Sequence, residues 1–286
     1  MKKKNAAELA VQAVFLICAL ASVGAVLGIS IYLALSGLPG ISKIGFVNFI
    51  SGKIWDAGKG QFGILPFILT SIYGTACAVT VSMPIGVLAA LFISRAAPGR
   101  IADLIRTAVD LLAAIPSVVW GLVGMTVLVP TVQRIFDLPS GSCLFTAIIV
   151  LSLMILPYII SVTRAAIDAV PDDYEQASLA LGATEYETYF KVTLRAASRG
   201  VLTAAVQAVG RSVGEATAVI MVSGNVARMP SLLGPVRFMT TAIVSEMSYA
   251  SYGSMQRQAL FSCGFVLFLF VMLINSLLEL LRKRSV

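Results

Sequence analysis

Residues 172–200 read DDYEQASLALGATEYETYFKVTLRAASRG and form the core of the longest polar stretch in the chain. Pro171 followed by two aspartates predicts a helix start, because proline and acidic side chains favour the first helical turn. Gly182 fits the chain reversal after this helix, where a left-handed backbone is needed. Thr184 with Glu187 three residues later predicts a capping box for a second helix. We therefore expect two short helices joined at a glycine.

Apolar runs flank this polar stretch on both sides. A helix needs about 20 apolar residues to cross a bilayer, and several charge-free runs reach that length. One further candidate, Val201–Val222, carries Arg211 and Glu215. We expect an all-α membrane protein with six transmembrane helices, near residues 12–35, 65–94, 110–131, 144–163, 201–222 and 261–281.

The composition excludes most soluble classes of protein. Hydrophobic residues make up 58% of the 286 residues and charged residues only 12%, whereas soluble domains carry about 25% charged residues. A soluble enzyme, a disordered chain and a DNA-binding domain are therefore excluded. The chain has no His, and its four Cys lack metal-ligand spacing. The sequence thus offers no His-based metal site, no Cys metal site and no catalytic triad.

The basic residues predict the orientation. The net charge of +7 in so apolar a chain indicates orientation in a bilayer rather than nucleic-acid binding. With both termini in the cytoplasm, most Lys and Arg fall on the inner side, including Lys2–Lys4, Lys191 and Arg282–Arg284. Lys2–Lys4 also precede an apolar run as in a signal peptide, but the run is too long for a signal core. We expect a retained anchor in a multi-pass protein of the cytoplasmic membrane.

Three prolines lie inside the predicted spans. Pro84, Pro116 and Pro157 fall within the second, third and fourth predicted helices. Each removes a backbone hydrogen bond and bends its helix. Kinks of this kind mildly favour a protein that forms a pathway over a simple anchor.

The polar stretch resembles the EAA loop of importer permeases of the ABC family. That loop has a Glu-Ala-Ala start, a central Gly and an Ile-x-Leu-Pro end. The positions that match are Glu175, Ala177, Gly182, Val192 and Leu194. Gln176 and Arg195 depart from the pattern, so the contacts of the loop differ in detail. The resemblance implies that residues 172–200 form the coupling helices that dock on an ATP-binding subunit.

Other segments resemble the permeases of phosphate importers. These are FGILP at 62–66, AIPSVVWG at 114–121 and GRSVGEATAVIMVSGN at 210–225. The end of the last segment and SEMSYA at 245–250 resemble the PstC-type rather than the PstA-type permease. The resemblance implies a type I ABC importer (MetI-like) permease fold. We expect an N-terminal anchor and outer segment at 1–62 and the importer transmembrane domain at 63–281.

The resemblance also implies partners and a mechanism. The partners would be a second, PstA-type permease, a dimer of ATP-binding subunits and an extracytoplasmic phosphate-binding protein. The chain has no Gly-x-x-x-x-Gly-Lys-Ser/Thr loop, so ATP and Mg are expected on the partner ATPase and no cofactor on this chain. The chain would be no enzyme itself, and phosphate would cross by alternating access.

Arg211 and Glu215 are the candidate substrate-pathway residues. An ionisable residue inside a membrane helix is costly unless it is paired or faces water. The two residues are four apart, so on one helix they share a face and can neutralise each other, while Gly210 and Gly214 allow another helix to approach. A structural ion pair is one interpretation. The other is that Arg211 contacts phosphate in transit, because guanidinium donors match phosphate oxygens.

Several alternatives stay open. Arg211 would suit sulfate or molybdate as well as phosphate, and the chain would then serve another oxyanion. A PstA-type partner subunit is a second alternative. An ATP-independent transporter should lack the docking loop and normally shows an internal repeat, which this sequence does not show. A sensory subunit would use the same pocket and loop.

Overall fold

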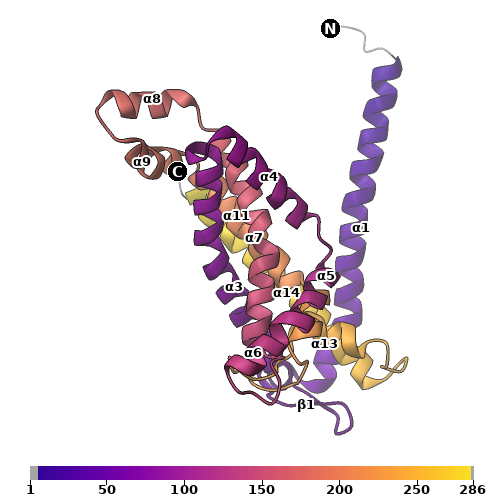
Figure 1. The fold of residues 1–286 in the computed structure, drawn as a ribbon. Coiled ribbons are helices and arrows are strands. Elements are labelled where there is room, and N and C mark those ends of the chain that lie inside the picture. Colours follow the sequence, from indigo (N-terminus) through magenta and orange to yellow (C-terminus); the bar gives the residue numbers. More distant parts are fainter. Residues whose placement is uncertain (1–5, 285–286) are drawn as a thin grey trace.

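A computed structural model describes residues 6–284 of the chain, which is mostly helical (Figure 1). The long helices are α1 (Ala6–Ile44), α3 (Leu65–Leu91), α4 (Gly99–Ala113), α7 (Leu144–Asp168), α11 (Ser198–Gly214) and α14 (Met255–Arg284). The shorter helices are α2 (Phe46–Ser51), α5 (Ser117–Val123), α6 (Val129–Ile135), α8 (Asp172–Ala180), α9 (Glu185–Thr188), α10 (Leu194–Ala196), α12 (Thr217–Val222) and α13 (Met239–Glu246). Three π-helical turns are η1 (Phe92–Ala96), η2 (Gly124–Leu128) and η3 (Tyr189–Thr193).

The elements separate toward two ends of the molecule. At one end, which we call the loop end, lie α8 and α9 together with the last turns of α14 and the first turns of α1 (Figure 1). At the other, the hairpin end, lie α6, α13 and an antiparallel hairpin of β1 (Trp55–Asp56) and β2 (Gln61–Phe62) (Figure 1). The described ends of the chain are therefore on the same side. Lys2–Lys4 lie outside the described residues.

Five helical segments in residues 6–284 are long and apolar enough to cross a membrane. They are Val11–Ile44, Leu65–Ala96, Ser117–Ile135, Leu144–Asp168 and Met255–Leu277. The predicted span at 201–222 is instead interrupted, because α11 ends at Gly214 and α12 begins at Thr217. Glu215 between them has an extended backbone, with φ −73° and ψ 125°. The sixth expected span is thus a broken helix and not a continuous one.

The prolines have two different roles. Pro84 and Pro157 lie inside α3 and α7, as predicted. Pro116 instead precedes α5 as its N-cap, with φ −60° and ψ 144°. A proline has no N–H to donate and disfavours helical backbone in the residue before it. The predicted span at 110–131 is therefore wrong at its start: α4 ends at Ala113, and the spanning segment begins at Ser117.

The centre of the molecule is a bundle in which α3 and α7 pack along each other and α11 packs on both. Close approach is needed at Gly86 of α3, where a Cβ would lie 2.6 Å from Cγ2 of Ile159 in α7. Buried residues of α7, such as Leu151 and Ile155, form the apolar core with residues of α11 and α12. The bundle therefore holds the broken helix on one flank.

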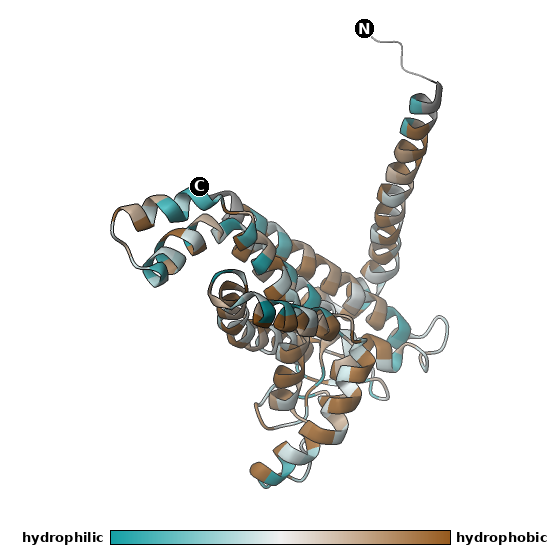
Figure 2. Cartoon of the chain, turned by 45° about the horizontal axis from the view of Figure 1, so that its top comes forward, coloured by the Kyte–Doolittle hydropathy of each residue, from teal (hydrophilic) through white to brown (hydrophobic). Residues whose placement is uncertain are grey.

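Helix α1 stands apart from the bundle along most of its length (Figure 1). It packs against α14 near the hairpin end, where Ser262 Oγ donates to the carbonyl of Gly37 over 2.6 Å. Tyr32 and Phe261 meet edge to face in the same region. Most of its other described side chains are apolar and exposed, and Figure 2 shows its ribbon mostly in hydrophobic colours. Such a surface suits a bilayer rather than water.

Candidate functional site

The polar segment at the loop end has the helix–glycine–helix form predicted for it. Helix α8 begins at Asp172 after Pro171. Gly182 has φ +86°, the left-handed region that favours glycine. Thr184 Oγ1 accepts from the N–H of Glu187 over 3.3 Å, and Glu187 Oε2 accepts from the N–H of Thr184 over 3.2 Å. The glycine reversal and the capping box are therefore confirmed.

The capping carboxylate stays charged at any physiological pH. Lys191 Nζ donates to Glu187 Oε1 over 2.9 Å. This hydrogen bond, followed by those from Thr184, lowers the pKa of Glu187 from 4.5 to about 2. The start of the second helix therefore keeps its cap across the whole neutral range.

Glu175 faces the bundle and not the solvent. Its Oε1 accepts from Arg95 Nε over 2.6 Å, and the two side chains are 16% and 14% exposed. The same oxygen accepts from Thr193 Oγ1 over 2.8 Å. Arg95 also donates from Nη2 to the carbonyl of Ile167 over 3.1 Å. Glu175 thus joins α8 to η1 through Arg95 and to η3 through Thr193. Arg95 extends the connection to α7 through the carbonyl of Ile167.

Two further contacts hold the segment to the bundle and to itself. Tyr189 of η3 donates to the carbonyl of Arg95 over 3.3 Å. Burial is the main cause that raises the pKa of Tyr189, so its hydroxyl remains a donor. Ser178 and Thr188 share a hydrogen bond of 2.9 Å between α8 and α9. The loop is therefore anchored at several points rather than hanging free.

The outer face of this segment exposes large apolar side chains among polar ones. Leu181 is 89% exposed and Tyr186 is 71% exposed. Ala177 and Gly182, two of the predicted coupling residues, lie on the surface with them. Leu194, a third, is half-buried and lines a hollow with Met83 of α3 and Ser198 of α11. Figure 2 shows hydrophilic ribbon on the same two helices, so the face mixes polar and apolar side chains.

Arg211 lies exposed near the end of α11. The structure gives it no hydrogen-bond or ion-pair partner within residues 6–284. The expected neutralising pair with Glu215 is not formed. The physical reason is that the helix ends at Gly214, so the two residues do not share a helix face. Arg211 is therefore an uncompensated cation next to the helix break.

Glu215 instead holds the start of α12. Its Oε1 accepts from the N–H of Ala218 over 2.9 Å. Its own carbonyl accepts from Thr240 Oγ1 over 2.8 Å. The carboxylate thus satisfies a backbone donor that the break leaves without an intrahelical partner. Both residues therefore lie at the break, but Arg211 is exposed without a partner in residues 6–284, whereas Glu215 caps α12.

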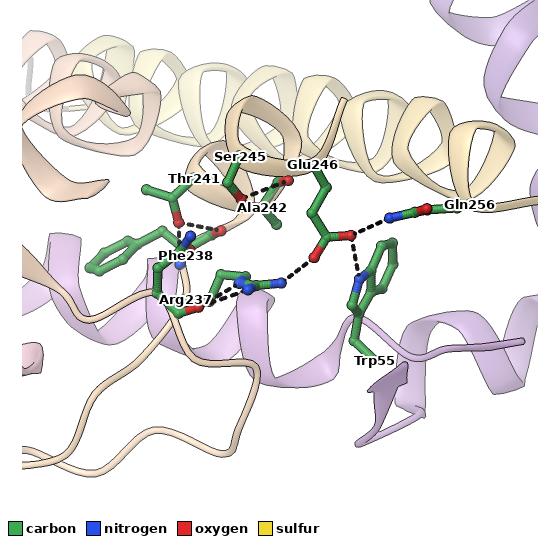
Figure 3. Close-up of polar contacts among 9 residues, drawn as sticks. Trp55, Arg237, Phe238, Thr241, Ala242, Ser245, Glu246 and Gln256 are labelled. Atoms are coloured by element: carbon green, nitrogen blue, oxygen red, sulfur yellow. Dashed lines mark hydrogen bonds and ion pairs between the residues drawn. The ribbon is translucent and has the colours of Figure 1, made fainter. Parts of the chain in front are cut away.

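The hairpin end contains a charged network that the sequence did not predict (Figure 3). Arg237 pairs through Nη1 with Glu246 Oε1, and the two side chains are 15% and 19% exposed. Glu246 Oε2 accepts from Trp55 Nε1 and from Gln256 Nε2, each over 2.9 Å. Arg237 also donates from Nε and Nη2 to the carbonyl of Asn225 over 3.0 and 2.8 Å. Residues 237–250 carry one Arg and one Glu in a mostly apolar stretch, and this pattern does not reveal their partners.

Comparison with known sequences gives matches over most of the chain. Residues 82–286 match the sequence model of a family described as "Binding-protein-dependent transport system inner membrane component". The "Probable ABC transporter permease protein YqgH" of Bacillus subtilis (strain 168) is 37% identical over 270 residues, which cover 91% of this chain and 87% of that protein. The "Phosphate transport system permease protein PstC" of Pasteurella multocida (strain Pm70) is 31% identical, covering 85% and 81%. PstC of Xylella fastidiosa (strain Temecula1) is 32% identical, covering 82% and 79%.

Solved structures share the fold at lower sequence identity. A chain of a bacterial alginate ABC transporter, in complex with its alginate-bound periplasmic protein, superposes with a TM-score of 0.67 at 16% identity, covering 94% of each chain. A chain of the MetNI methionine ABC transporter in an inward-facing conformation gives 0.59 at 20% identity, covering 78% of this chain and 94% of that one. At these identities the likeness concerns the arrangement of helices.

Proposed function

The chain belongs to the family of binding-protein-dependent transport system inner membrane components, and on this premise we propose that it is the PstC-type permease subunit of an ATP-driven phosphate importer. The family and the structural neighbours confirm the MetI-like importer permease fold that the sequence resemblance implied. The chain is a multi-pass inner-membrane protein whose relatives are permeases and not enzymes. Phosphate as substrate is supported by the PstC relatives.

Arg211 carries the proposal for the substrate. A membrane helix rarely holds a cation that has no partner and no access to water, yet Arg211 has no partner in residues 6–284. It therefore requires a partner from outside the chain or a water-filled path. The planar guanidinium offers paired donors to phosphate oxygens. Glu215 at the helix break would moderate the positive potential, so that the anion binds weakly enough to leave.

The loop end supports the coupling role. The exposed residues Leu181 and Tyr186 suit a groove in an ATP-binding subunit, because burial of apolar surface drives association and tyrosine is a frequent anchor in such contacts. The Arg95–Glu175 ion pair would pass a movement of the loop to α3 and α7. ATP binding and hydrolysis in the partner would then open the bundle alternately to each side.

The remaining subunits follow from the same proposal. They are a second, PstA-type permease, two ATP-binding subunits that hold ATP and Mg, and an extracytoplasmic phosphate-binding protein at the hairpin end. The loop end, with both described ends of the chain (Figure 1), would then face the cytoplasm. This chain would supply the path and the docking loop but no nucleotide site.

Uptake of labelled phosphate tests the proposal. Phosphate-starved cells with and without the gene are compared, with excess sulfate present and the partner genes intact. We expect high-affinity uptake to vanish on deletion and to return with the intact gene. Unchanged phosphate uptake together with lost sulfate or molybdate uptake would assign the chain to another oxyanion. Unchanged uptake of all three anions in cells that lack a second phosphate system would reject a transport role.

A further inference from the structure

The hairpin end contains a segment that holds the broken helix in place. We propose that the segment Arg237–Thr240 forms a clamp, in the sense that it hydrogen-bonds to the chain before and after α12. Glu246 is the positioning residue that holds Arg237 in this clamp. This inference rests on the transport function proposed above. The clamp would thereby set the position of Glu215 in the substrate pathway. Glu246 acts through other residues and is not proposed to contact phosphate.

The first end of α12 is held by Thr240. Its Oγ1 donates to the carbonyl of Glu215 over 2.8 Å, and Thr240 is only 8% exposed. The carboxylate of Glu215 in turn accepts from Ala218 N in the first turn of α12. Thr240 therefore fixes the backbone of the residue whose side chain caps the helix.

The second end of α12 is held by Arg237. Its guanidinium donates twice to the carbonyl of Asn225, three residues beyond the last helical residue Val222. Asn225 has φ +52°, a left-handed conformation that a non-glycine residue adopts only with local support. The neighbouring Val236 donates its N–H to the carbonyl of Ser223 over 2.8 Å. The turn after α12 is thus fixed from the same segment that holds its start.

The clamp also contacts α3. The N–H of Met239 donates to Ser71 Oγ over 3.1 Å, and both residues are buried. Phe238 lies against Gly74, where a Cβ would come within 2.7 Å of the ring carbon Cζ. The clamp consequently ties α12 to a helix of the central bundle, so that α12 cannot shift alone.

Both carboxylate oxygens of Glu246 accept hydrogen bonds in this arrangement (Figure 3). One oxygen accepts from Arg237 and the other from Trp55 of the hairpin and Gln256 of α14. Arg237 is mostly buried, so its charge needs this carboxylate. Removing the negative charge would free the guanidinium to leave Asn225. The hairpin, the clamp and α14 would then lose their common attachment.

The test uses the complete importer, reconstituted with its partner subunits in lipid nanodiscs and proteoliposomes. A Thr217→Cys reporter on exposed Thr217, in a background with the four native cysteines replaced, reports the position of α12 by its rate of reaction with a maleimide. Glu246→Gln should change this rate about fivefold, the effect of about one lost hydrogen bond. In the same variant the kcat for phosphate uptake or its KM should change about tenfold. Glu246→Asp, which keeps the charge, should restore part of both.

Two further variants make the result decisive. Asp56→Asn removes the charge of a partly exposed carboxylate of the same hairpin, which pairs with the exposed Lys59. The amide oxygen of Asn can still accept from the N–H groups of Gly58 and Lys59 as Asp56 Oδ1 does, so this variant should change neither readout. Thr240→Val removes the hydrogen bond to Glu215 without touching Glu246 and should reproduce the change in reporter rate, even where Glu246→Gln fails to assemble. An unchanged reporter rate in Thr240→Val, or a Glu246→Gln importer that assembles, labels and transports like the parent, would overturn the clamp. The reporter rate needs no substrate, so a parent complex that moves no phosphate would reject the proposed function alone.

Discussion

Arg95 and Glu175, 80 residues apart in the chain, are joined by a hydrogen-bonded ion pair of 2.6 Å between Nε and Oε1. Arg95 lies in η1 at the end of the helix that begins with α3, and Glu175 lies in the first half of α8. The pair is mostly buried and is reinforced by Thr193. It therefore links the polar loop directly to the membrane bundle.

Replacing Glu175 by Ala should uncouple the loop from the bundle. The change removes the closer carboxylate from the mostly buried Arg95 guanidinium and leaves it only the half-exposed Asp168, 3.7 Å from Nη1. Removing one partner of such a buried pair costs about 3 kcal/mol. We expect phosphate uptake and the ATPase stimulation by the binding protein to fall at least about tenfold, while basal ATP hydrolysis persists. Both rates are measured on the reconstituted importer.

The matched control is Glu185→Ala, which removes an exposed carboxylate from the same loop. It should leave both rates near those of the parent. The double variant Arg95→Met with Glu175→Met should recover part of the coupling, because an apolar pair removes the uncompensated charge. Full coupling in Glu175→Ala would show that the ion pair does not transmit the movement.

Gly182 should tolerate Asn better than Ala. A Cβ at this position meets nothing within 4 Å, so the cost of a substitution comes only from the backbone at φ +86°. For Ala this cost is about 1 kcal/mol, and Asn adopts the left-handed region more readily. Hydrogen exchange of the amides around residues 181–186 should be faster in Gly182→Ala than in Gly182→Asn. Equal exchange in both variants would mean that the reversal does not limit the order of the loop.

Gly86 should tolerate no side chain at all. The Cβ of an alanine there would lie 2.6 Å from Cγ2 of Ile159, in the tightly packed α3–α7 contact. Overpacking of this kind costs about 1–3 kcal/mol. We expect Gly86→Ala to lower the thermal unfolding temperature of the purified protein, and Ile159→Ala in the same chain to restore part of it.

Gly24→Ala is the matched control for Gly86. Gly24 lies on α1, where a Cβ meets nothing within 4 Å. Alanine there should leave the unfolding temperature unchanged or raise it, because alanine is the better helix former. An equal loss of stability in both variants would point to a general effect of the substitution and not to the α3–α7 contact.

Local chemistry made the loop end predictable. Pro171, Gly182 and the Thr184–Glu187 capping box act on residues within one turn of themselves, so their structural effects can be inferred from short sequence spacing. The long spans α3 and α7 were predictable for a related reason, since length and apolar composition alone indicate a membrane helix. The structure agrees with the sequence-based prediction in all of these regions.

Distant contacts made the helix break and the hairpin end unpredictable. The break at Glu215 is stabilised by Thr240, 25 residues away, and Glu246 receives a hydrogen bond from Trp55, 191 residues away. The sequence shows a mostly apolar run at 201–222 that carries Arg211 and Glu215, and it gives no sign of such donors. Assuming a continuous helix there also produced the incorrect Arg211–Glu215 pair. Tertiary hydrogen bonds thus decided what the local pattern left undetermined.

The capping box should be insensitive to pH from about pH 5 upward. The pKa of Glu187 falls from 4.5 to about 2 on folding, so its stabilising effect is present above pH 4.5 and is lost as the pH falls toward 2. Exchange of the Glu187 amide, corrected for its intrinsic rate, should be the same at pH 5 and pH 7.5. Lys191→Met removes the main cause of the lowered pKa and should move the loss of protection toward higher pH. A loss of protection between pH 7.5 and 5 in the parent would contradict this assignment.

Arg211→Gln should abolish phosphate uptake and leave the importer assembled. The change keeps a polar side chain of similar length but removes the charge and the paired donors that match phosphate oxygens. Arg211→Lys keeps the charge without the planar geometry and should retain part of the rate. Uptake is measured in proteoliposomes, with assembly checked by co-purification of the ATP-binding subunits.

Arg134→Gln is the appropriate control for Arg211, because Arg134 is also exposed and lies on α6 at the hairpin end, away from the helix break. It makes the same change in net charge, so a general effect of charge on assembly or anion attraction should appear in both variants. A loss confined to Arg211→Gln would place the guanidinium in the path of the anion. Normal uptake by Arg211→Gln would instead mean that the cation at the break serves contact with the second permease, and the search for the phosphate ligand would move to that subunit.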